Sequence, residues 1–486
     1  MTTPARITPT DRPEENGRQA ATSERPDVLV VVGRPTFDLS SAQPLVEAAI
    51  NSLDIATVVV GGGRILQSPE EISAAIETLP RMARHLLVLF ASFADSRLAA
   101  AAVDHFDHVD GIILWSLPEP WTGGRLRRNS LCGATLAAHR LVAEGHVVAG
   151  LHEDPGPGTE QSVQRALTRV RTRAVRRVAP TPGQLDTAER LVVDDAVASV
   201  RSTHLGVVGA APAGFEPCEV DATFVPAGVT VERTTVHDLF AASASPLSLA
   251  DEHTVTDLRD MAGNDVLPRD AVEHSVALQG GAERLAQRNQ WNALAIRCWP
   301  ECFDEWCGAA CAAMALLNER GLPAACEADA LGALSMRLMQ SLSGEPTFLA
   351  DLVEIDEVGD RVAFWHCGVA PRTMADPAGD VRVALHSNRQ QPLVFDFALA
   401  EAPVTMLRIS KSGGIPALVV GEGRLTGEHP FAGTSGVVQL TGSAQSLIDT
   451  MIEEGLEHHV VLAIGHHQRL LEAVAAELDL PVIHLT

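Results

Sequence analysis

The sequence predicts an α/β protein, with two Rossmann-like, doubly wound α/β domains followed by a C-terminal antiparallel β-barrel domain. Continuous apolar runs rich in β-branched residues alternate with helical stretches in the earlier part of the chain, which is typical of buried parallel strands with crossover helices. After about residue 345, short strands follow one another with Gly and Pro turns, which indicates an antiparallel barrel or sandwich. A chain of 486 residues has room for this arrangement at roughly 100–200 residues per domain.

Residues 27–165 are predicted to form the first α/β domain. The preceding residues 1–26 are rich in Pro, Thr, Glu and Arg, a composition that indicates a disordered tail. The run DVLVVVG at residues 27–33 is apolar, β-branched and closed by Gly, as a buried parallel strand is. A helix and three more strands are expected after it, at residues 41–53 and at residues 56–60, 85–90 and 111–114.

Residues 166–345 are predicted to form the second α/β domain, which the chain enters through a connecting helix over residues 160–178. The segment GAACAAMALLNER at residues 308–320 predicts a helix that Gly321 ends at its C-terminal cap. Strands of this domain are expected at residues 204–208, 230–235 and 292–298.

Residues 346–486 are predicted to form the barrel domain and its closing helices. The short strands are expected at residues 361–366, 381–385, 393–397, 404–409, 416–421 and 436–440. The chain is then expected to finish with a helix, a strand, a helix and a strand, at residues 444–454, 460–464, 468–478 and 482–485.

Composition excludes several classes of function. With 62 acidic and 37 basic residues the net charge is −25, which repels nucleic acid and anionic membranes. Lys411 is the only lysine, and its setting RISKSGG fits neither Schiff-base chemistry nor a phosphate-binding loop. The sequence shows no signal peptide and no apolar run of about 18 residues, and its eight cysteines are scattered. These features predict a cytoplasmic protein with reduced thiols.

Two groups of residues offer ligands for a metal. The cysteines at positions 298, 302, 307 and 311 are spaced more widely than the C-x2-C pairs of most zinc and iron–sulfur sites, which favours a role as small core residues. Histidines lie close to predicted strand ends, with His366 after one strand and His459 before another. Neutral imidazole is a common ligand for first-row metals.

Three carboxylates on apolar backgrounds are more informative. Glu327 and Asp329 lie in PAACEADALGAL, and Asp351 lies in PTFLADLVEI. An isolated buried charge is costly, so each of them must be paired, protonated or bound to a metal. The residues alone leave two interpretations: helix capping or an ion pair with arginine, and a metal or acid/base role.

Several segments together resemble the L-fucose isomerase family, whose fold is shared with L-arabinose isomerase. Its metal-binding core is similar to residues 298–351, CWPECFDEWCGAACAAMALLNERGLPAACEADALGALSMRLMQSLSGEPTFLAD. The likeness extends to GGRLRRNSLCG, HLGVVGAAPAGF, FWHCG and the terminal HHVVLAIG, which occur in the order that the family has. The resemblance therefore covers nearly the whole chain after the tail.

The resemblance implies a metal site and a reaction. Glu327, Asp351 and His459 match the residues that bind one Mn²⁺ in the family, a donor set that also suits Co²⁺, Fe²⁺ or Zn²⁺. Glu327 and Asp351 would also move the proton between C1 and C2 of an open-chain sugar through an ene-diolate. His366 matches a position that binds either the metal or the substrate.

Further expectations follow from the same resemblance. Trp299 is a candidate for stacking on the sugar or for core packing, and Arg128 for a substrate or a subunit contact. A homo-oligomer, hexamer or trimer, is expected, in which the N-terminal domain of one subunit covers the site of its neighbour. The leading hypothesis is an aldose–ketose isomerase acting on a sugar or a modified sugar. The alternatives are a metal-dependent lyase or epimerase using the same ene-diolate, and a non-catalytic sugar-binding protein.

Overall fold

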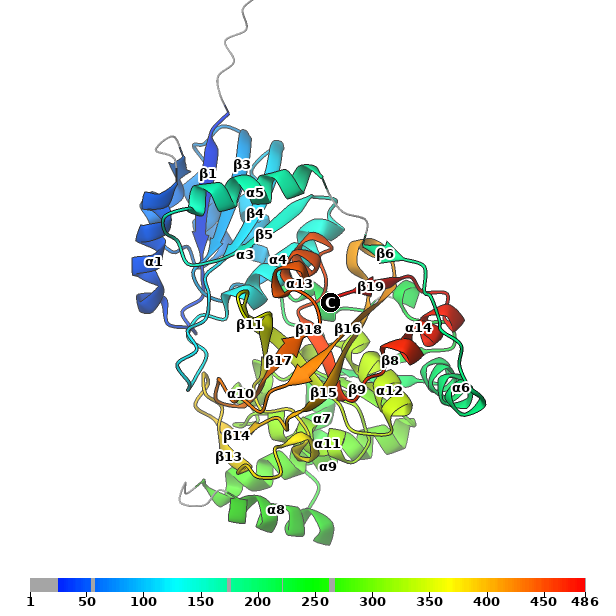
Figure 1. Cartoon of the computed structure of the whole chain (residues 1–486). Coiled ribbons are helices and arrows are strands. Elements are labelled where there is room, and N and C mark those ends of the chain that lie inside the picture. The colour runs from blue at the N-terminus through cyan, green and yellow to red at the C-terminus, as the bar shows by residue number, and fades with distance from the viewer. Residues whose placement is uncertain (1–24, 54–56, 173–175, 221, 262–266, 486) are drawn as a thin grey trace, which may run out of the picture.

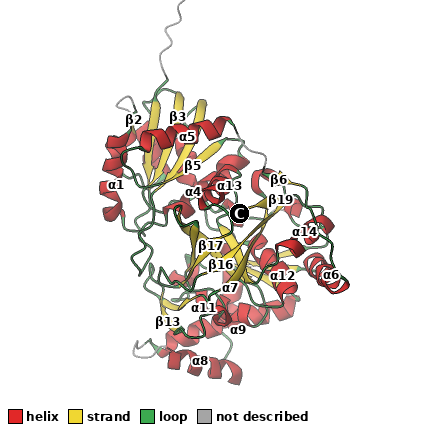
Figure 2. Ribbon diagram, in the orientation of Figure 1, coloured by secondary structure: helices red, strands yellow, loops and turns green. Residues whose placement is uncertain are grey.

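The computed structural model describes residues 25–53, 57–172, 176–220, 222–261 and 267–485. The prediction of a disordered tail concerns residues that lie almost entirely outside these ranges. Three sheets organise the described chain, two parallel and one mainly antiparallel, which confirms the predicted fold class (Figures 1 and 2).

The N-terminal sheet is parallel throughout, with the strand order β2-β1-β3-β4-β5. Alternate residues of β1 face opposite sides, so Val28 and Val30 pack toward α2, α3 and α4, whereas Leu29 and Val31 pack toward α1 and α5. The strands are β1 (Asp27–Val32), β2 (Val58–Val59), β3 (Met82–Phe90), β4 (His108–Ser116) and β5 (Val148–His152). The helices are α1 (Leu39–Ser52), α2 (Pro69–Ile76), α3 (Ser96–Val103), α4 (Ser130–Ala143) and α5 (Thr159–Arg171).

The central sheet is also parallel, with the order β10-β9-β7-β8. Helices α6 and α12 cover one face of it, and α7, α9 and α11 cover the other. The strands are β7 (His204–Val208), β8 (Thr230–Thr234), β9 (Ala293–Ile296) and β10 (Ala324–Ala325). The helices are α6 (Thr187–Arg201), α7 (Val236–Ser243), α8 (Leu249–Met261), α9 (Arg269–Asn289), α10 (Glu301–Asp304), α11 (Cys311–Glu319) and α12 (Ala330–Ser343).

The third sheet contains a closed antiparallel barrel. Strand β17 pairs with β12 on one side and with β16 on the other, so the ring β17-β12-β11-β18-β15-β16 returns to its start. The ring strands are β11 (Phe348–Asp356), β12 (Arg361–His366), β15 (Ala402–Ser410), β16 (Ala417–Leu425), β17 (Thr434–Leu440) and β18 (His459–Ile464). Outside the ring are β6 (Arg177–Val178), β13 (Arg382–Leu385), β14 (Pro392–Ala398), β19 (Val482–His484), α13 (Ala444–Glu453) and α14 (Gln468–Glu477).

Two expectations about single elements were wrong. The helix expected over residues 160–178 ends at Arg171, and Arg177–Val178 instead form β6, which pairs with β19 at the edge of the barrel sheet. The hairpin of β13 and β14 does not belong to the ring, because β14 runs parallel to β17 and joins it through only two residue pairs. No helix in the described part of the chain is both long and apolar enough to cross a membrane.

The loops that follow the parallel strands converge on one region. The loops after β1 and β3 leave the N-terminal sheet at its topological switch point, where the chain passes from one side of β1 to the other. The loops after β7 and β9 occupy the corresponding point of the central sheet. Open α/β sheets bind ligands at such points.

A buried ion pair joins the N-terminal sheet to the barrel. His152, at the end of β5, lies 2.9 Å through Nε2 from Oε1 of Glu354 in β11. Burial lowers the pKa of His152, but the charge of Glu354 and the hydrogen bond outweigh it, so the pKa is raised. A group whose pKa is raised on folding stabilises the fold below its unfolded pKa, and loses that contribution as the pH rises through the folded value.

We therefore expect the stability of His152→Gln relative to the native protein to depend on pH. At pH 6 the substitution should cost about 1.5–3 kcal/mol of unfolding free energy, as for a hydrogen bond to a charged group, and the cost should shrink toward pH 9. Urea denaturation at several pH values measures this. His108→Gln, in the exposed pair of His108 with Asp110, is the matched control. A cost independent of pH would contradict a charged His152.

Candidate active site

A cavity of about 390 Å³ opens where these loops meet the barrel. That volume is in the range of pockets that bury small ligands. Its polar residues come from all three sheets, and its aromatic lining consists of Phe37, Phe93, Phe215, Trp299, Phe303 and Trp365. Apolar walls of this kind exclude water and strengthen the electrostatic interactions inside.

The barrel register places two candidate ligands side by side. Asp351 on β11 is the direct partner of His459 on β18, and its Oδ1 lies 3.5 Å from Nε2 of that histidine. Both side chains are buried. On a strand, neighbouring residues point to opposite faces, so a shift of one residue in this pairing would turn one of the two away.

Glu327 reaches the same point from the central sheet. It lies in the turn after β10, and its backbone is left-handed, with φ of 59°. Such a conformation is strained for a residue with a side chain. The turn brings Oε2 of Glu327 to 3.7 Å from Nε2 of His459 and 3.1 Å from Nε2 of His458. The indole N–H of Trp299 donates to Oε1 at 3.4 Å.

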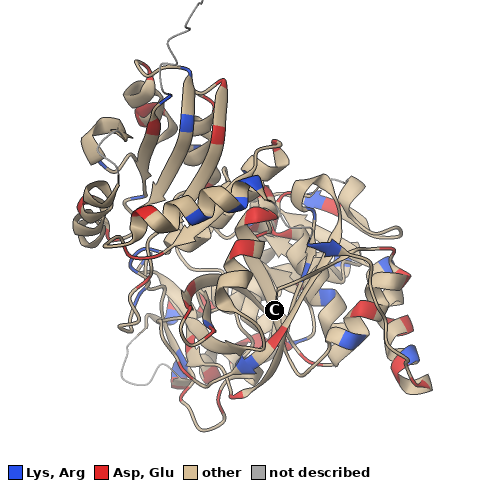
Figure 3. Ribbon diagram, turned by 45° about the horizontal axis from the view of Figure 1, so that its top comes forward, with Lys and Arg blue, Asp and Glu red and all other residues tan. Residues whose placement is uncertain are grey.

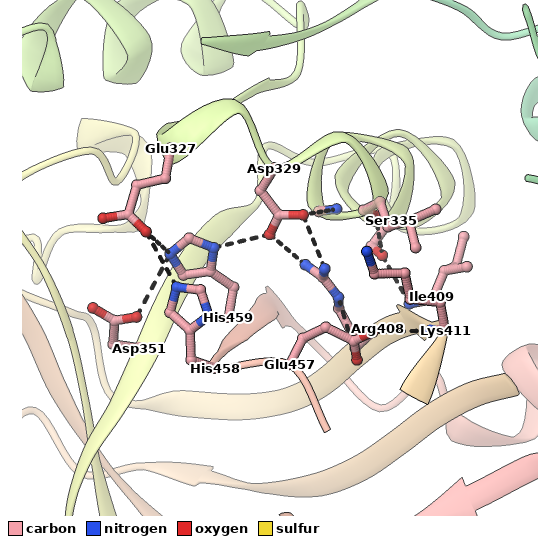
Figure 4. Close-up of polar contacts among 12 residues, drawn as sticks. Glu327, Asp329, Ser335, Asp351, Arg408, Ile409, Lys411, Glu457, His458 and His459 are labelled. Carbon is pink, nitrogen blue, oxygen red and sulfur yellow. Dashed lines mark hydrogen bonds and ion pairs between the residues drawn. The ribbon is translucent and has the colours of Figure 1, made fainter. Parts of the chain in front are cut away.

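The far side of His459 is held by a buried ion pair (Figure 4). Nδ1–H of His459 donates to Oδ2 of Asp329 at 2.8 Å, and Arg408 donates to both oxygens of that carboxylate, at 2.5 and 2.9 Å. Asp329 also caps α12 by accepting from the Gly332 amide. Because Nδ1 carries the proton, the lone pair of the neutral ring lies on Nε2 and points toward Glu327 and Asp351.

Glu327 and Asp351 each belong, with His459, to a cluster of side chains that could hold a metal, the first with Cys218 and His458 and the second with His366. Nε2 of His459 is buried and has no hydrogen-bond partner among the described residues, although two carboxylate oxygens lie within 3.7 Å of it. Burying such an atom without a partner is costly, and a cation between these groups would satisfy it. Two carboxylates and one imidazole are donors that Mn²⁺ and its neighbours accept.

His366 has the opposite tautomer to His459. It ends β12, is buried, and its ring stacks on that of His459 with centroids 5.4 Å apart. Nδ1 of His366 accepts the Cys367 amide N–H at 2.8 Å, so in the neutral ring the proton is on Nε2. Nε2 is buried and without a partner in the described chain, and it lies in the cavity wall. A ring in this tautomer donates a hydrogen bond to a ligand in the cavity.

The two carboxyl groups differ in proton affinity. Burial raises the pKa of Asp351 to about 7, and the charge of His459 only partly opposes it. Burial also acts to raise the pKa of Glu327, but the hydrogen bond from His458 and the charges of the neighbouring histidines hold it below its usual value. Without a metal, the cluster therefore contains one ionised carboxylate and one that titrates near neutrality.

The three imidazoles of the site also differ in pKa. Burial lowers the pKa of His366 to about 3 and that of His458 to about 4, and the charge of His459 adds to both effects. The pKa of His459 is raised despite its burial, by the hydrogen bond to Asp329 and the charge of Asp351. A metal that takes Nε2 of His459 must displace a proton from it, so metal binding becomes weaker as the pH falls.

The remaining predicted site residues fall into two groups. Trp299 lines the cavity and contacts Glu327. Arg128 does not line the cavity: its guanidinium donates to the Pro118 carbonyl, and its neighbour Asn129 lies in the wall instead. Of the four spaced cysteines, Cys307 alone is exposed, and the other three are buried.

Among the other cavity residues, sequence reasoning singled out Asn129 and missed Arg389. Asn129, the N-cap residue of α4, has a left-handed backbone with φ of 49°, and its buried Oδ1 has no partner among the described residues. Its place in GGRLRRNSLCG marked it, with Arg128, as a candidate for a substrate or a subunit contact. Arg389 lies in the polar turn SNRQQ, which differs in no way from an ordinary surface turn.

Comparison with known proteins places this geometry among sugar isomerases. No protein-family model matches the chain. The chain is 28% identical over 461 residues to the sulfoquinovose isomerase of Alkalicoccus urumqiensis, which covers 93% of this chain and 98% of that one. It is 27% identical to the sulfoquinovose isomerase of Priestia megaterium, with 90% and 94% covered, and 29% identical to that of a Clostridium species, with 94% and 98% covered.

These relatives share one name and align with this chain along almost their whole length. They confirm the prediction of an enzyme and, with it, the coarser part of the predicted function. The chain is an intramolecular oxidoreductase of the sugar isomerase kind.

Proposed function

We propose that this enzyme is a divalent-metal-dependent aldose–ketose isomerase that converts sulfoquinovose, or a closely similar sulfonated hexose, through an ene-diolate. The observation that carries the proposal is the convergence of two cavity-lining carboxylates, Glu327 and Asp351, on Nε2 of the buried His459, which has no hydrogen-bond partner among the described residues. The substrate is proposed from the names of the relatives. Sulfoquinovose is a glucose with a sulfonate group on C6 in place of the hydroxyl.

The reaction needs groups of the kinds found here. Conversion of an aldose to a ketose removes a proton from C2, returns a proton to C1, and shifts a proton between the two oxygens. Glu327 and Asp351 can take and return the carbon-bound proton, and we leave open which acts first. Nε2–H of His366 can donate to a substrate oxygen. Trp299 holds Oε1 of Glu327 in place.

Glu327, Asp351 and His459 would hold the metal, with Mn²⁺ as the proposed ion and Co²⁺, Fe²⁺ or Zn²⁺ as others that the donors suit. A divalent cation held there supplies positive charge that stabilises the negative charge of an ene-diolate. Asp329 and Arg408 act on this set indirectly, because they fix the tautomer and the ring orientation of His459.

Metal removal and return test the proposal. We expect protein stripped with a chelator to be inactive on sulfoquinovose and Mn²⁺ to restore activity, since without the cation the ene-diolate has no counter-charge. In D₂O, proton NMR should show deuterium at C1 or C2 together with conversion to the ketose. Labelling without conversion would point to an epimerase or a lyase. Full activity in the stripped protein, verified free of metal, would overturn the metal-dependent mechanism.

A further inference from the structure

One arginine of the cavity wall has no acidic partner. Of the arginines that line the cavity, Arg34 and Arg97 both pair with Asp95, which neutralises part of their charge. The guanidinium of Arg389 makes no hydrogen bond or ion pair with any described residue, and the side chain is exposed. In a protein with a net charge of −25, an unpaired cation in a cavity is a marked local exception.

The surroundings of Arg389 hold it in place without neutralising it. Its guanidinium carbon lies 5.6 Å from the ring centroid of Trp299 and 5.6 Å from that of Phe303. Aromatic faces attract a guanidinium through its plane and leave its N–H groups free at the edge. The turn is fixed by the buried His386, whose Nδ1 accepts the backbone N–H groups of Asn388 and Arg389 at 3.2 and 3.3 Å.

Trp299 links this arginine to the catalytic carboxylates. One face of the indole contacts Arg389, and its N–H donates to Glu327, so the guanidinium and the acid cluster lie on different sides of one side chain. Asn388, next to Arg389 in the wall, has a buried Oδ1 without a partner among the described residues, which can accept from a sugar hydroxyl. In the ribbon view of Figure 3, segments that carry Lys or Arg are interspersed with segments that carry Asp or Glu.

We propose that Arg389, supported by Trp299 and Phe303, is the subsite for a tetrahedral oxyanion at the end of the sugar remote from the reacting carbons. The fork of N–H groups matches two oxygens of such an anion. The assignment rests on the proposed function, in which the oxyanion is the C6 sulfonate. A C6 phosphate has the same chemistry and is the alternative source. Arg389 thus distinguishes sugars that carry an oxyanion on C6 from sugars that do not, a difference that the carboxylates do not recognise.

The test compares Arg389→Met and Arg389→Lys with the native enzyme on sulfoquinovose, glucose 6-phosphate and glucose. Methionine keeps an apolar stem against the rings, and lysine keeps the charge without the fork. We expect KM for sulfoquinovose to rise roughly 10- to 100-fold in Arg389→Met, as on loss of a charge-assisted hydrogen bond, with kcat little changed because the contact is remote from C1 and C2. Arg389→Lys should show a smaller rise in KM for sulfoquinovose than Arg389→Met. In both variants, kcat/KM for glucose should stay within about threefold of the native value.

A second measurement keeps the two proposals apart. Calorimetric titration of sulfoquinovose into the metal-stripped native protein and metal-stripped Arg389→Met, which the proposed mechanism leaves inactive, reports binding without turnover. Arg382→Met is the control, because Arg382 belongs to the same hairpin but is exposed and pairs with Asp396 outside the cavity. We expect this control to bind and turn over sulfoquinovose as the native protein does.

Each outcome bears on one proposal or the other. Equal losses on sulfoquinovose and glucose, or unchanged binding in Arg389→Met, would overturn the oxyanion subsite and leave the isomerase proposal standing. Arg389-dependent binding of sulfoquinovose without isomerisation by the native enzyme would overturn the proposed function and support the subsite. A stronger dependence on Arg389 for glucose 6-phosphate than for sulfoquinovose would identify phosphate as the preferred anion.

Discussion

Glu327→Gln is expected to lower kcat for isomerisation by roughly 10²- to 10⁴-fold, the usual contribution of a positioned general acid or base. The amide is nearly the same size and can still accept from Trp299, so the cavity should keep its shape. It has no exchangeable carboxyl proton and no charge, so it can neither move the proton of the substrate nor bind a cation as strongly. Steady-state kinetics with saturating Mn²⁺, and deuterium incorporation in D₂O, measure the loss.

The matched control for this variant is Glu401→Gln. Glu401 lies on the exposed surface, where it pairs with Arg424, and we expect its amide to leave kcat and KM unchanged. Near-ultraviolet circular dichroism checks that Glu327→Gln remains folded. If the folded variant kept more than about a tenth of the native kcat, Glu327 would not be an acid or base in the reaction, as the usual size of that effect requires. Unchanged sugar binding with no native turnover at all would favour the non-catalytic alternative.

Arg408→Met is expected to have the largest effect on stability, about 3–5 kcal/mol of unfolding free energy. Arg408 is 1% exposed, and its guanidinium faces Asp329 on one side and Glu457, at 3.9 Å, on the other. The guanidinium holds the pKa of Asp329 far below its usual value, despite the burial that acts to raise it. Its removal takes away the guanidinium that faces both buried carboxylates. Urea denaturation with a fluorescence probe measures the change.

Two further variants test whether the loss of stability in Arg408→Met comes from the buried charges. Arg424→Met removes a guanidinium from an exposed pair, and should change the unfolding free energy by less than about 1 kcal/mol. The double variant Arg408→Met/Asp329→Asn should be more stable than Arg408→Met alone, because it also removes one unpaired charge. If the double variant lost stability additively, the cost of Arg408→Met would come from packing and not from the buried charges.

The sequence predicts the fold best where an element is defined by an uninterrupted local pattern. The apolar run at residues 27–33 and the short apolar segment over residues 361–366 predict β1 and β12 to within one residue. Strand β6 could not be predicted, because it has only two residues, both polar or exposed at an edge. A barrel was predicted, but the strands that close it could not be identified, since the pairing of β17 with β16 joins strands whose partners no local pattern specifies.

The candidate site was also predicted only in part. Glu327, Asp351 and His459 were named from a resemblance, and the structure brings their side chains together, but their roles stay predictions until the variants are measured. Asp329 was singled out as a costly buried charge, and both of its expected uses occur, since it caps α12 and pairs with Arg408. Arg389 has no such signal, because its proposed role depends on its lacking an acidic partner among the described residues, and that depends on tertiary packing.

The pairing of Asp351 with His459 across β11 and β18 bears on the order of folding. These strands are far apart in the chain, and β18 enters the ring between two strands that precede it in sequence, so its pairing closes a long loop and is entropically late. The proposed ligand set therefore does not assemble until β18 has paired with β11. An ion could not serve as a template for the earlier stages of folding. It would act on the finished barrel, where binding to the native state alone slows the opening of the ring.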